Sequence, residues 1–314
     1  MNETSAGVIG LGNMGRGIAT NLGKHGRTVY VWDLKEAARE RFKGKPDFVI
    51  APPGEMAKHC AVIFFLVPAT PEIKDCLNGD DGIVANARDG LILCDLTTSD
   101  PLATRALAAE LAPKGIHYID AGTSGGPTRS DTGELTLMVG GDPEAFKRVK
   151  PFLDDIAKTV YYLGASGTGH TMKLLHNVVC HATFFATTEA LRLGERAGLQ
   201  LGDMVEVLNN SNARSYVTES RYPKHILSQK WDGRSRIYNM FKDIGMGVDL
   251  GHRLGGGTEF SEATLRYLDK AMRRGMAEDD YTLIYRDFDE IRVVEGAPKS
   301  GTCGAAGGKT RGAA

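Results

Sequence analysis

The feature that most constrains the fold is a regular alternation, in the first half of the chain, of short apolar runs with stretches of helical pattern. Runs that are apolar throughout and are separated by helices are typical of parallel strands buried on both faces. The sequence therefore predicts a doubly wound α/β sheet in this half. The predicted strands are "GVIG" (7–10), "TVYVWD" (28–33), "AVIFFLV" (61–67), "LILCD" (91–95), "HYIDA" (117–121), "LTLMVG" (135–140) and "TVYYL" (159–163).

A glycine-rich turn, "VIGLGNMGRGIATNL" (8–22), joins the first predicted strand to a predicted helix. Gly10 would allow the tight turn, Gly12 would let the backbone approach a pyrophosphate, and Gly15 would let the helix pack closely on the strand. The pyrophosphate would lie on the first amides of that helix. This predicts a Rossmann-type dinucleotide site that also includes Leu11, Asn13 and Met14. A glycine turn in another α/β fold is the alternative, whereas a P-loop is excluded because no GK[ST] follows.

An acidic residue, Asp33, ends the second predicted strand at roughly the 20-residue spacing that the dinucleotide fingerprint requires. Its carboxylate can accept hydrogen bonds from the adenosine ribose hydroxyls and would repel a 2′-phosphate. We therefore expect NAD as the cofactor. Lys35 and Arg39 lie close by in the sequence and leave NADP open.

Two later strand ends, "LVPATP" (66–71) and "DLTTSDP" (95–101), also agree with a cofactor groove. In doubly wound sheets, ligands bind beyond the carboxyl ends of the strands. Val67, Pro68 and Thr98 are therefore expected to line the nicotinamide half of the groove. Ordinary strand-to-helix turns explain the same residues equally well.

The second half begins with "GASGTGHTMKLLHNVVCHATFFATTEALRLGERAG" (164–198), which predicts one helix of about eight turns. Between Thr171 and Thr188 the only formally charged side chain is Lys173. A helix that is apolar nearly all round is expected to be buried. Burial would lower the pKa of the lysine and let it exchange protons near neutral pH. The alternative is a lysine that extends to solvent at the edge of the helix.

Asn177 lies one helical turn beyond Lys173 and should share its face, where it could bind the amine or a substrate. His176 is interpreted as a satisfied core histidine, as are His170 and His181. If His176 were protonated instead, its charge would lower the lysine pKa further.

The remaining chain predicts further helices over 201–215, 240–257, 261–275 and 279–294. By itself, the adjacent pair Lys242 and Asp243 in one of them is typical of a helix surface. The last residues are rich in Gly and Ala and are expected to be disordered. The expected organisation is a dinucleotide-binding domain (1–165), a helical domain (166–298) and a tail (299–314).

Composition narrows the possible partners. The net charge of -1 gives no basic excess for nucleic acid, and no apolar run reaches the ~20 residues that span a bilayer. The N-terminus lacks the pattern of a secretory signal. The five cysteines are odd in number and scattered, without a CxxC pair, which indicates reduced thiols, no metal site and a cytoplasmic location.

Four motifs occur in one order: "GLGNMGRGIATNL" (10–22), "DAGTSGG" (120–126), "GTGHTMKLLHN" (167–177) and "KDIGMGVDL" (242–250). Together they resemble the β-hydroxyacid dehydrogenase family over nearly all of residues 6–295. The resemblance implies a dinucleotide domain and an all-helical domain joined by the long helix. It also implies a homodimer or homotetramer formed through the helical half.

The resemblance implies roles for particular residues. Ser124, Gly125 and Gly126 would hold the substrate carboxylate, for which a glycine-rich turn offers converging amides. The other expected roles are a general acid/base (Lys173), a positioning group (Asn177) and a cofactor contact with its support (Lys242, Asp243). Arg129 either reaches a second anionic group on the substrate or is solvated. "DAGTSGG" replaces the frequent "DAPVSGG", and "HN" at 176–177 replaces "NN".

The expected function is NAD-dependent oxidation of a small 3-hydroxy carboxylic acid, or the reverse reduction. A 6-phosphogluconate-like oxidative decarboxylase and an imine reductase are alternatives on the same fold. Imine reductases usually carry aspartate or tyrosine where Lys173 stands. A dinucleotide-binding module without catalysis is a third alternative, against which Ser124, Lys173 and Asn177 argue.

Overall fold

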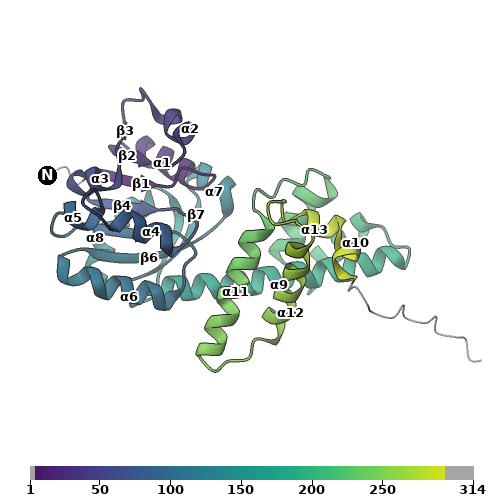
Figure 1. Cartoon of the computed structure of the whole chain (residues 1–314). Coiled ribbons are helices and arrows are strands. Elements are labelled where there is room, and N and C mark those ends of the chain that lie inside the picture. Colours follow the sequence, from purple (N-terminus) through teal and green to yellow (C-terminus); the bar gives the residue numbers. More distant parts are fainter. Residues whose placement is uncertain (1–3, 294–314) are drawn as a thin grey trace, which may run out of the picture.

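The computed structural model describes residues 4–293 and consists of an α/β part and a helical part (Figure 1). The long helix α9 (Thr168–Arg196) starts beneath the sheet and continues through the helical part. The predicted tail (299–314) lies outside the described residues, as does the end of the expected helical domain. The fold class expected from the sequence is confirmed.

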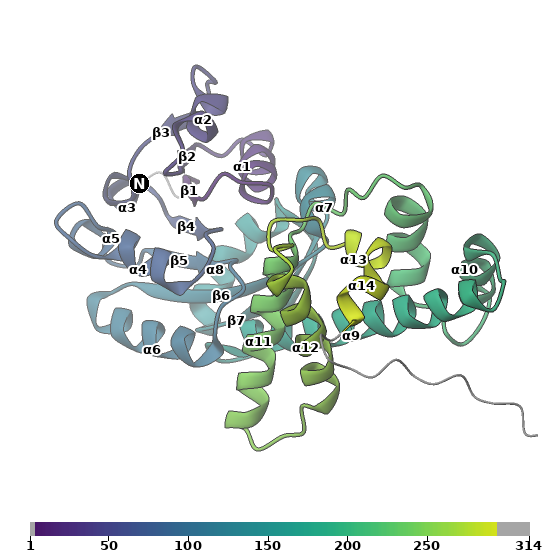
Figure 2. The same cartoon turned by 45° about the vertical axis from the view of Figure 1, so that its right-hand side comes forward.

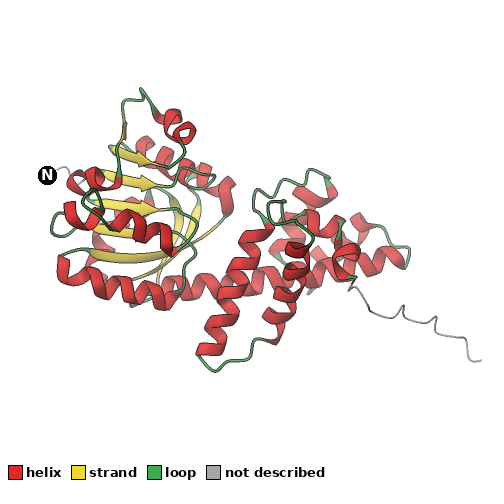
Figure 3. Cartoon of the chain, viewed as in Figure 1, coloured by secondary structure: helices red, strands yellow, loops and turns green. Residues whose placement is uncertain are grey.

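One eight-stranded sheet has the order β3-β2-β1-β4-β5-β6-β7-β8. The strands are drawn as yellow arrows in Figure 3, with red helices around them. The six strands from β3 to β6 in this order are parallel. The strands are β1 (Ala6–Ile9), β2 (Val29–Trp32), β3 (Phe48–Ile50), β4 (Val62–Phe65), β5 (Ile92–Asp95), β6 (His117–Ser124), β7 (Leu135–Gly140) and β8 (Ala157–Tyr162).

The expectation of an all-parallel sheet is wrong at one edge, where β7 runs antiparallel to β6 and β8 is parallel to β7. The segment 125–134 between β6 and β7 is too short to connect parallel strands, because a parallel crossover needs about a dozen residues or more. The strand β3 was also not predicted. It has only three residues and is partly exposed, so it lacks a strong apolar signal.

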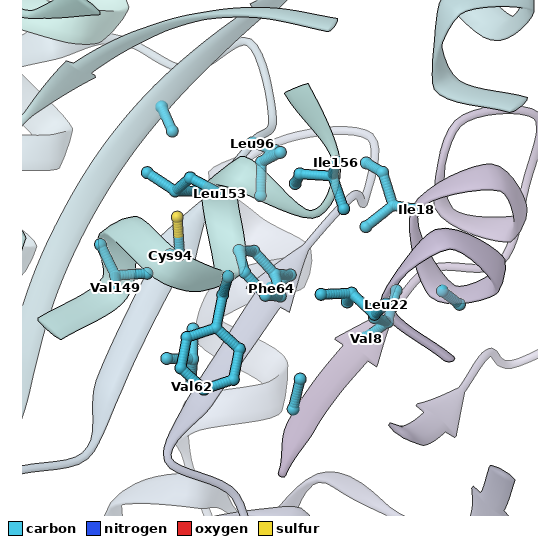
Figure 4. Close-up of a cluster of buried hydrophobic side chains, with 14 of the residues drawn as sticks. Val8, Ile18, Leu22, Val62, Phe64, Cys94, Leu96, Val149, Leu153 and Ile156 are labelled. Atoms are coloured by element: carbon cyan, nitrogen blue, oxygen red, sulfur yellow. The ribbon is translucent and has the colours of Figure 1, made fainter. Parts of the chain in front are cut away.

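Helices cover both faces of the sheet, and successive residues of β4 point to opposite sides. Phe64 packs with Ile18 and Leu22 of α1 and with Val149 of α8 (Figure 4), while Ile63 belongs to the core on the other face. The sheet helices are α1 (Gly15–Lys24), α2 (Glu36–Arg39), η1 (Glu40–Phe42), α3 (Pro53–His59), α4 (Thr70–Leu77), α5 (Ile83–Asn86), α6 (Pro101–Leu111), η2 (Ala112–Lys114), α7 (Gly126–Thr132) and α8 (Pro143–Asp154).

The helical part has its own apolar core, and α11 and α12 lie side by side against α9 (Figure 2). Its other elements are α10 (Leu201–Asn209), the π-helical η3 (Val217–Leu227), α11 (Ile237–Arg253), α12 (Glu259–Arg273), α13 (Leu283–Arg286) and α14 (Phe288–Arg292). The segment η3 was not predicted, and the helix expected over 279–294 is interrupted at Asp287. Within residues 4–293, no helix combines the length and hydropathy needed to cross a membrane.

The burial expected for α9 is incomplete in the single chain. Leu174 and Phe184 are fully buried, but Leu175 and Val179 are 50% and 67% exposed. The strands β6 and β7 and the helices α11 and α12 pack against only part of its circumference. An apolar stripe therefore stays uncovered in the single chain.

Candidate active site

A single groove of about 2030 Å³ runs along the carboxyl edge of the sheet and against the helical part. Small-ligand pockets usually measure about 300–1,000 Å³, so this groove has room for a dinucleotide and a substrate. All the site residues expected from the sequence line it. They are Gly10, Leu11, Gly12, Asn13, Met14, Gly15, Asp33, Val67, Pro68, Thr98, Ser124, Gly125, Gly126, Arg129, Lys173, Asn177, Lys242 and Asp243.

The glycine turn after β1 has the shape that a dinucleotide requires. Gly10 has φ +92°, and a Cβ there would overlap the carbonyl of Leu66. A Cβ on Gly15 would overlap the carbonyl of Gly10, so the start of α1 packs directly on the turn. A Cβ on Gly12 would meet nothing within 4 Å, which leaves the backbone there open to a ligand. These three positions fit the pyrophosphate of a dinucleotide.

Asp33 follows β2 and lies beside the glycine turn. One carboxylate oxygen accepts the amide of Leu11 at 2.7 Å, and the other accepts the amide of Lys35 at 2.8 Å. The Arg39 guanidinium stacks on Trp32 and donates to the Asp33 carbonyl at 2.6 Å. The carboxylate is thus fixed at the edge of the groove, and Arg39 is held by the backbone.

The position of Lys173 is set by a buried carboxylate in the sheet. Asp120 on β6 accepts the amides of Gly167 at 2.7 Å and of His170 at 2.9 Å, which fastens the first turn of α9 to the sheet. Gly122 lies two residues further along β6, and a Cβ there would lie 2.5 Å from the Lys173 Cβ. The "DAGTSGG" segment therefore seats the lysine as well as lining the groove.

The amine of Lys173 makes no hydrogen bond to any residue that the structure describes, and the side chain lines the groove. Burial lowers the pKa of this amine, and the neighbouring Asp243 carboxylate opposes that shift. A lysine with a lowered pKa can both accept and donate a proton.

A directed set of hydrogen bonds connects Asp243 to Ser124. The amide nitrogen of Asn177 donates to Asp243 at 2.8 Å, because a carboxylate can only accept. The Asn177 oxygen therefore faces Nδ1 of His176 at 3.0 Å, which places the imidazole proton on Nδ1. Burial and the charge of Lys173 lower the pKa of His176, so its Nε2 is free to accept from the Ser124 hydroxyl at 3.2 Å.

Lys242 closes this arrangement from α11. Its Nζ donates to the carbonyl of Thr98 at 3.1 Å and lies 3.0 Å from Asp243 Oδ1. The pair that looked like a helix surface thus reaches across to the turn after β5.

Of the three histidines interpreted as satisfied core residues, only one has that role in the structure. His170 is a satisfied core residue, with Nδ1 2.7 Å from the Thr104 hydroxyl and Nε2 3.2 Å from the Asp95 carbonyl. His181 is buried, but its Nδ1 has no partner among the described residues. His176 is not a core histidine, since it lines the groove and binds Ser124. Its spacing of three residues from Lys173 was the available signal.

Two arginines line different parts of the groove. Arg129 is exposed, and its stem packs against Gly125. Arg221 on η3 contacts Cys180 of α9 and was not identified from the sequence. No local pattern pointed to it, because η3 itself was not predicted.

The fold and the groove define a nicotinamide-dinucleotide-dependent oxidoreductase, and comparisons with known proteins agree. Residues 5–164 match the model of the NAD binding domain of 6-phosphogluconate dehydrogenase. Residues 167–288 match the NAD-binding model of NADP-dependent 3-hydroxyisobutyrate dehydrogenase. The chain belongs to the β-hydroxyacid dehydrogenase family, as the motifs indicated.

Named relatives cover most of the chain. A 2-(hydroxymethyl)glutarate dehydrogenase of Eubacterium barkeri is 29% identical, covering 92% of this chain and 96% of the relative. An L-threonate dehydrogenase of Cupriavidus necator is 31% identical over 91% of this chain and 97% of its own length. A crystal structure of 3-hydroxyisobutyrate dehydrogenase from Salmonella typhimurium has a TM-score of 0.80 at 27% identity, covering 90% of this chain and 99% of that one.

Proposed function

We propose that this protein oxidises a small 3-hydroxy carboxylic acid with NAD, or catalyses the reverse reduction. The observation that carries the proposal is the amine of Lys173, which faces the groove without a partner in the described chain, beside the 124–126 turn. The similarity to dehydrogenases of hydroxymethylglutarate, threonate and hydroxyisobutyrate supports this substrate class.

The substrate carboxylate would bind at the turn after β6. Gly125 and Gly126 have φ values of +127° and +64°, a conformation that glycine adopts readily and that can turn successive amides toward one anion. The hydroxyl of Ser124 would join them by rotating away from His176. This turn lies next to Lys173 because Gly122 packs on the lysine stem.

Lys173 would accept the proton of the substrate hydroxyl during oxidation and return it during reduction. When bound, NAD would supply the acceptor for the hydride that leaves the carbon bearing this hydroxyl. Asp243 would stabilise the protonated amine, and Asn177 would hold Asp243 in place through their 2.8 Å hydrogen bond. Lys242 would contact the cofactor where it bridges to Thr98.

The test replaces Lys173 by alanine and measures NADH formation with 3-hydroxyisobutyrate, 2-(hydroxymethyl)glutarate and L-threonate. General acid/base groups contribute about 10²–10⁴-fold, so kcat should fall by that factor while the Kd for NAD changes little. Lys147, an exposed lysine on α8, provides the matched control K147A with unchanged kcat. A K173A enzyme with near wild-type kcat would contradict the proposed role.

We also propose NAD rather than NADP, because the fixed Asp33 carboxylate would repel a 2′-phosphate. Running the same assay with NADP tests this, and a higher kcat/KM with NADP would overturn it. Lys35 and Arg41 also line the groove and are the residues to examine in that case.

The alternatives gain less support. The helical half matches the model of a hydroxyisobutyrate dehydrogenase, which favours that branch over a 6-phosphogluconate-like decarboxylase. Lys173 argues against an imine reductase, and a groove with an acid/base lysine argues against a module without catalysis. We propose the domain division near residue 165, where the two matched models meet.

We further propose a homodimer or homotetramer formed through the helical half. The exposed apolar side chains of α9, such as Val179 and Leu193, provide a surface that a second copy would cover. The proposed compartment is the cytoplasm, which the free thiols of the four described cysteines support.

A further inference from the structure

One end of the groove holds a cation that no described carboxylate neutralises. Arg221 extends from η3, and its Nη2 donates to the thiol of Cys180 at 3.1 Å. Its Nη1 is buried and has no hydrogen-bond partner within residues 4–293. The guanidinium stacks on the Tyr281 ring at 4.9 Å, which fixes its plane.

This cation lies near the proposed reaction centre. Lys173, Asn177 and Cys180 are spaced at four and three residues and share one face of α9. Seven residues of helix place Cys180 about 10 Å further along the axis than Lys173. The charge of Arg221 also lowers the pKa of Lys173, His176 and His181, as expected of a nearby cation.

The contacts of Arg221 leave its charge and one of its hydrogen-bond donors without a strong partner in the described chain. A thiol is a weak hydrogen-bond acceptor, and a buried charged donor without a partner is costly. Two other partly enclosed arginines have carboxylate partners: Arg27 pairs with Asp155 at 2.8 Å and Arg192 with Asp289 at 2.7 Å. His181 adds a second buried polar atom, Nδ1, without a described partner at this end of the groove.

We propose that Arg221 binds a second carboxylate of the substrate, so that the enzyme prefers 3-hydroxy acids that carry two carboxylates. This inference rests on the proposed function. The first carboxylate occupies the 124–126 turn, the hydroxyl faces Lys173, and the second carboxylate accepts from Nη1 and Nη2 of Arg221. That pair of bonds replaces the contact with the Cys180 thiol and gives the stronger, two-point geometry of guanidinium with carboxylate. Arg129 is exposed to solvent, so it is a weaker candidate for binding this second carboxylate than the enclosed Arg221.

A matched pair of substrates tests the proposal. 2-(Hydroxymethyl)glutarate equals 3-hydroxyisobutyrate with a carboxymethyl group added to its methyl, so the reacting carbon and first carboxylate are the same. In R221M, the ratio of kcat/KM for the dicarboxylate to that for the monocarboxylate should fall about 30-fold. R221K should retain part of the preference for the dicarboxylate. R214M removes an exposed arginine that pairs with Glu219 and should leave the ratio unchanged.

Binding without turnover separates this inference from the proposed function. Calorimetry with NADH present should show that glutarate binds the wild-type protein more tightly than butyrate, and that R221M removes the difference. Equal binding of the two acids by the wild type, or an unchanged kcat/KM ratio in R221M, overturns the Arg221 site. If no 3-hydroxy acid is oxidised while glutarate binding still depends on Arg221, the dehydrogenase proposal fails and the anion site stands.

Discussion

At the residue scale, the proposed chemistry depends on the proton affinity of one amine. Burial lowers the pKa of Lys173, the charges of Arg221 and Lys242 lower it further, and Asp243 raises it. Oxidation needs the neutral amine and reduction needs the protonated amine. The arrangement of charges around Lys173 therefore sets the pH range in which each direction is fast.

The pH dependence of the reaction should follow from the lowered pKa of Lys173. For oxidation, log kcat/KM should rise with pH and then level off, with the midpoint of the rise below 10.5, the ordinary pKa of lysine. For reduction, log kcat/KM should fall with pH through the same midpoint. In D243N the midpoint should move to lower pH, because the group that raises the lysine pKa is lost. A midpoint that moves upward in D243N would contradict this account.

At the scale of elements, the site depends on how α9 is fastened to β6. The fully buried Asp120 accepts two amides from the start of α9, and Gly122 provides the space for the lysine stem. These contacts make the helix and the strand one structural unit. A displacement of the first turn of α9 would carry Lys173 away from the 124–126 turn.

Removing that carboxylate should lower both stability and rate. D120A leaves the amides of Gly167 and His170 without an acceptor, which should cost about 3 kcal/mol in the free energy of unfolding. Chemical denaturation measures this, and kcat should fall as well. The control D154A removes an exposed carboxylate that pairs with Lys150 and should cost less than about 0.5 kcal/mol. Equal stability of D120A and D154A would show that Asp120 is not an anchor.

At the scale of the whole molecule, the groove exists because two separate cores are held face to face. Besides α9, Lys242 and Arg253 of α11 reach the turn after β5, where Lys242 binds the Thr98 carbonyl and Arg253 pairs with Asp100 at 2.7 Å. Of these two contacts, only the one made by Lys242 lies in the groove.

The two bridging residues should therefore differ in their effect on cofactor binding. K242M should weaken NAD about tenfold, because a charged hydrogen-bond donor is lost from the groove. R253M removes a bridge of the same kind outside the groove and should change the Kd by less than twofold. Calorimetric titration of NAD measures both, and an equal effect of the two changes would argue for a general role in holding the halves together.

Sequence alone determined the doubly wound sheet, the glycine turn with Asp33, and the long helix with its isolated lysine, because these depend on local spacing and on alternation of apolar residues. Tertiary structure decided the antiparallel β7, the exposed stripe of α9, and the His176–Ser124 contact. It also decided the position of Arg221, which lies 41 residues from Cys180 in the chain. Local patterns fix which face of an element is apolar, but which polar groups meet depends on how distant elements pack, and no local pattern encodes that.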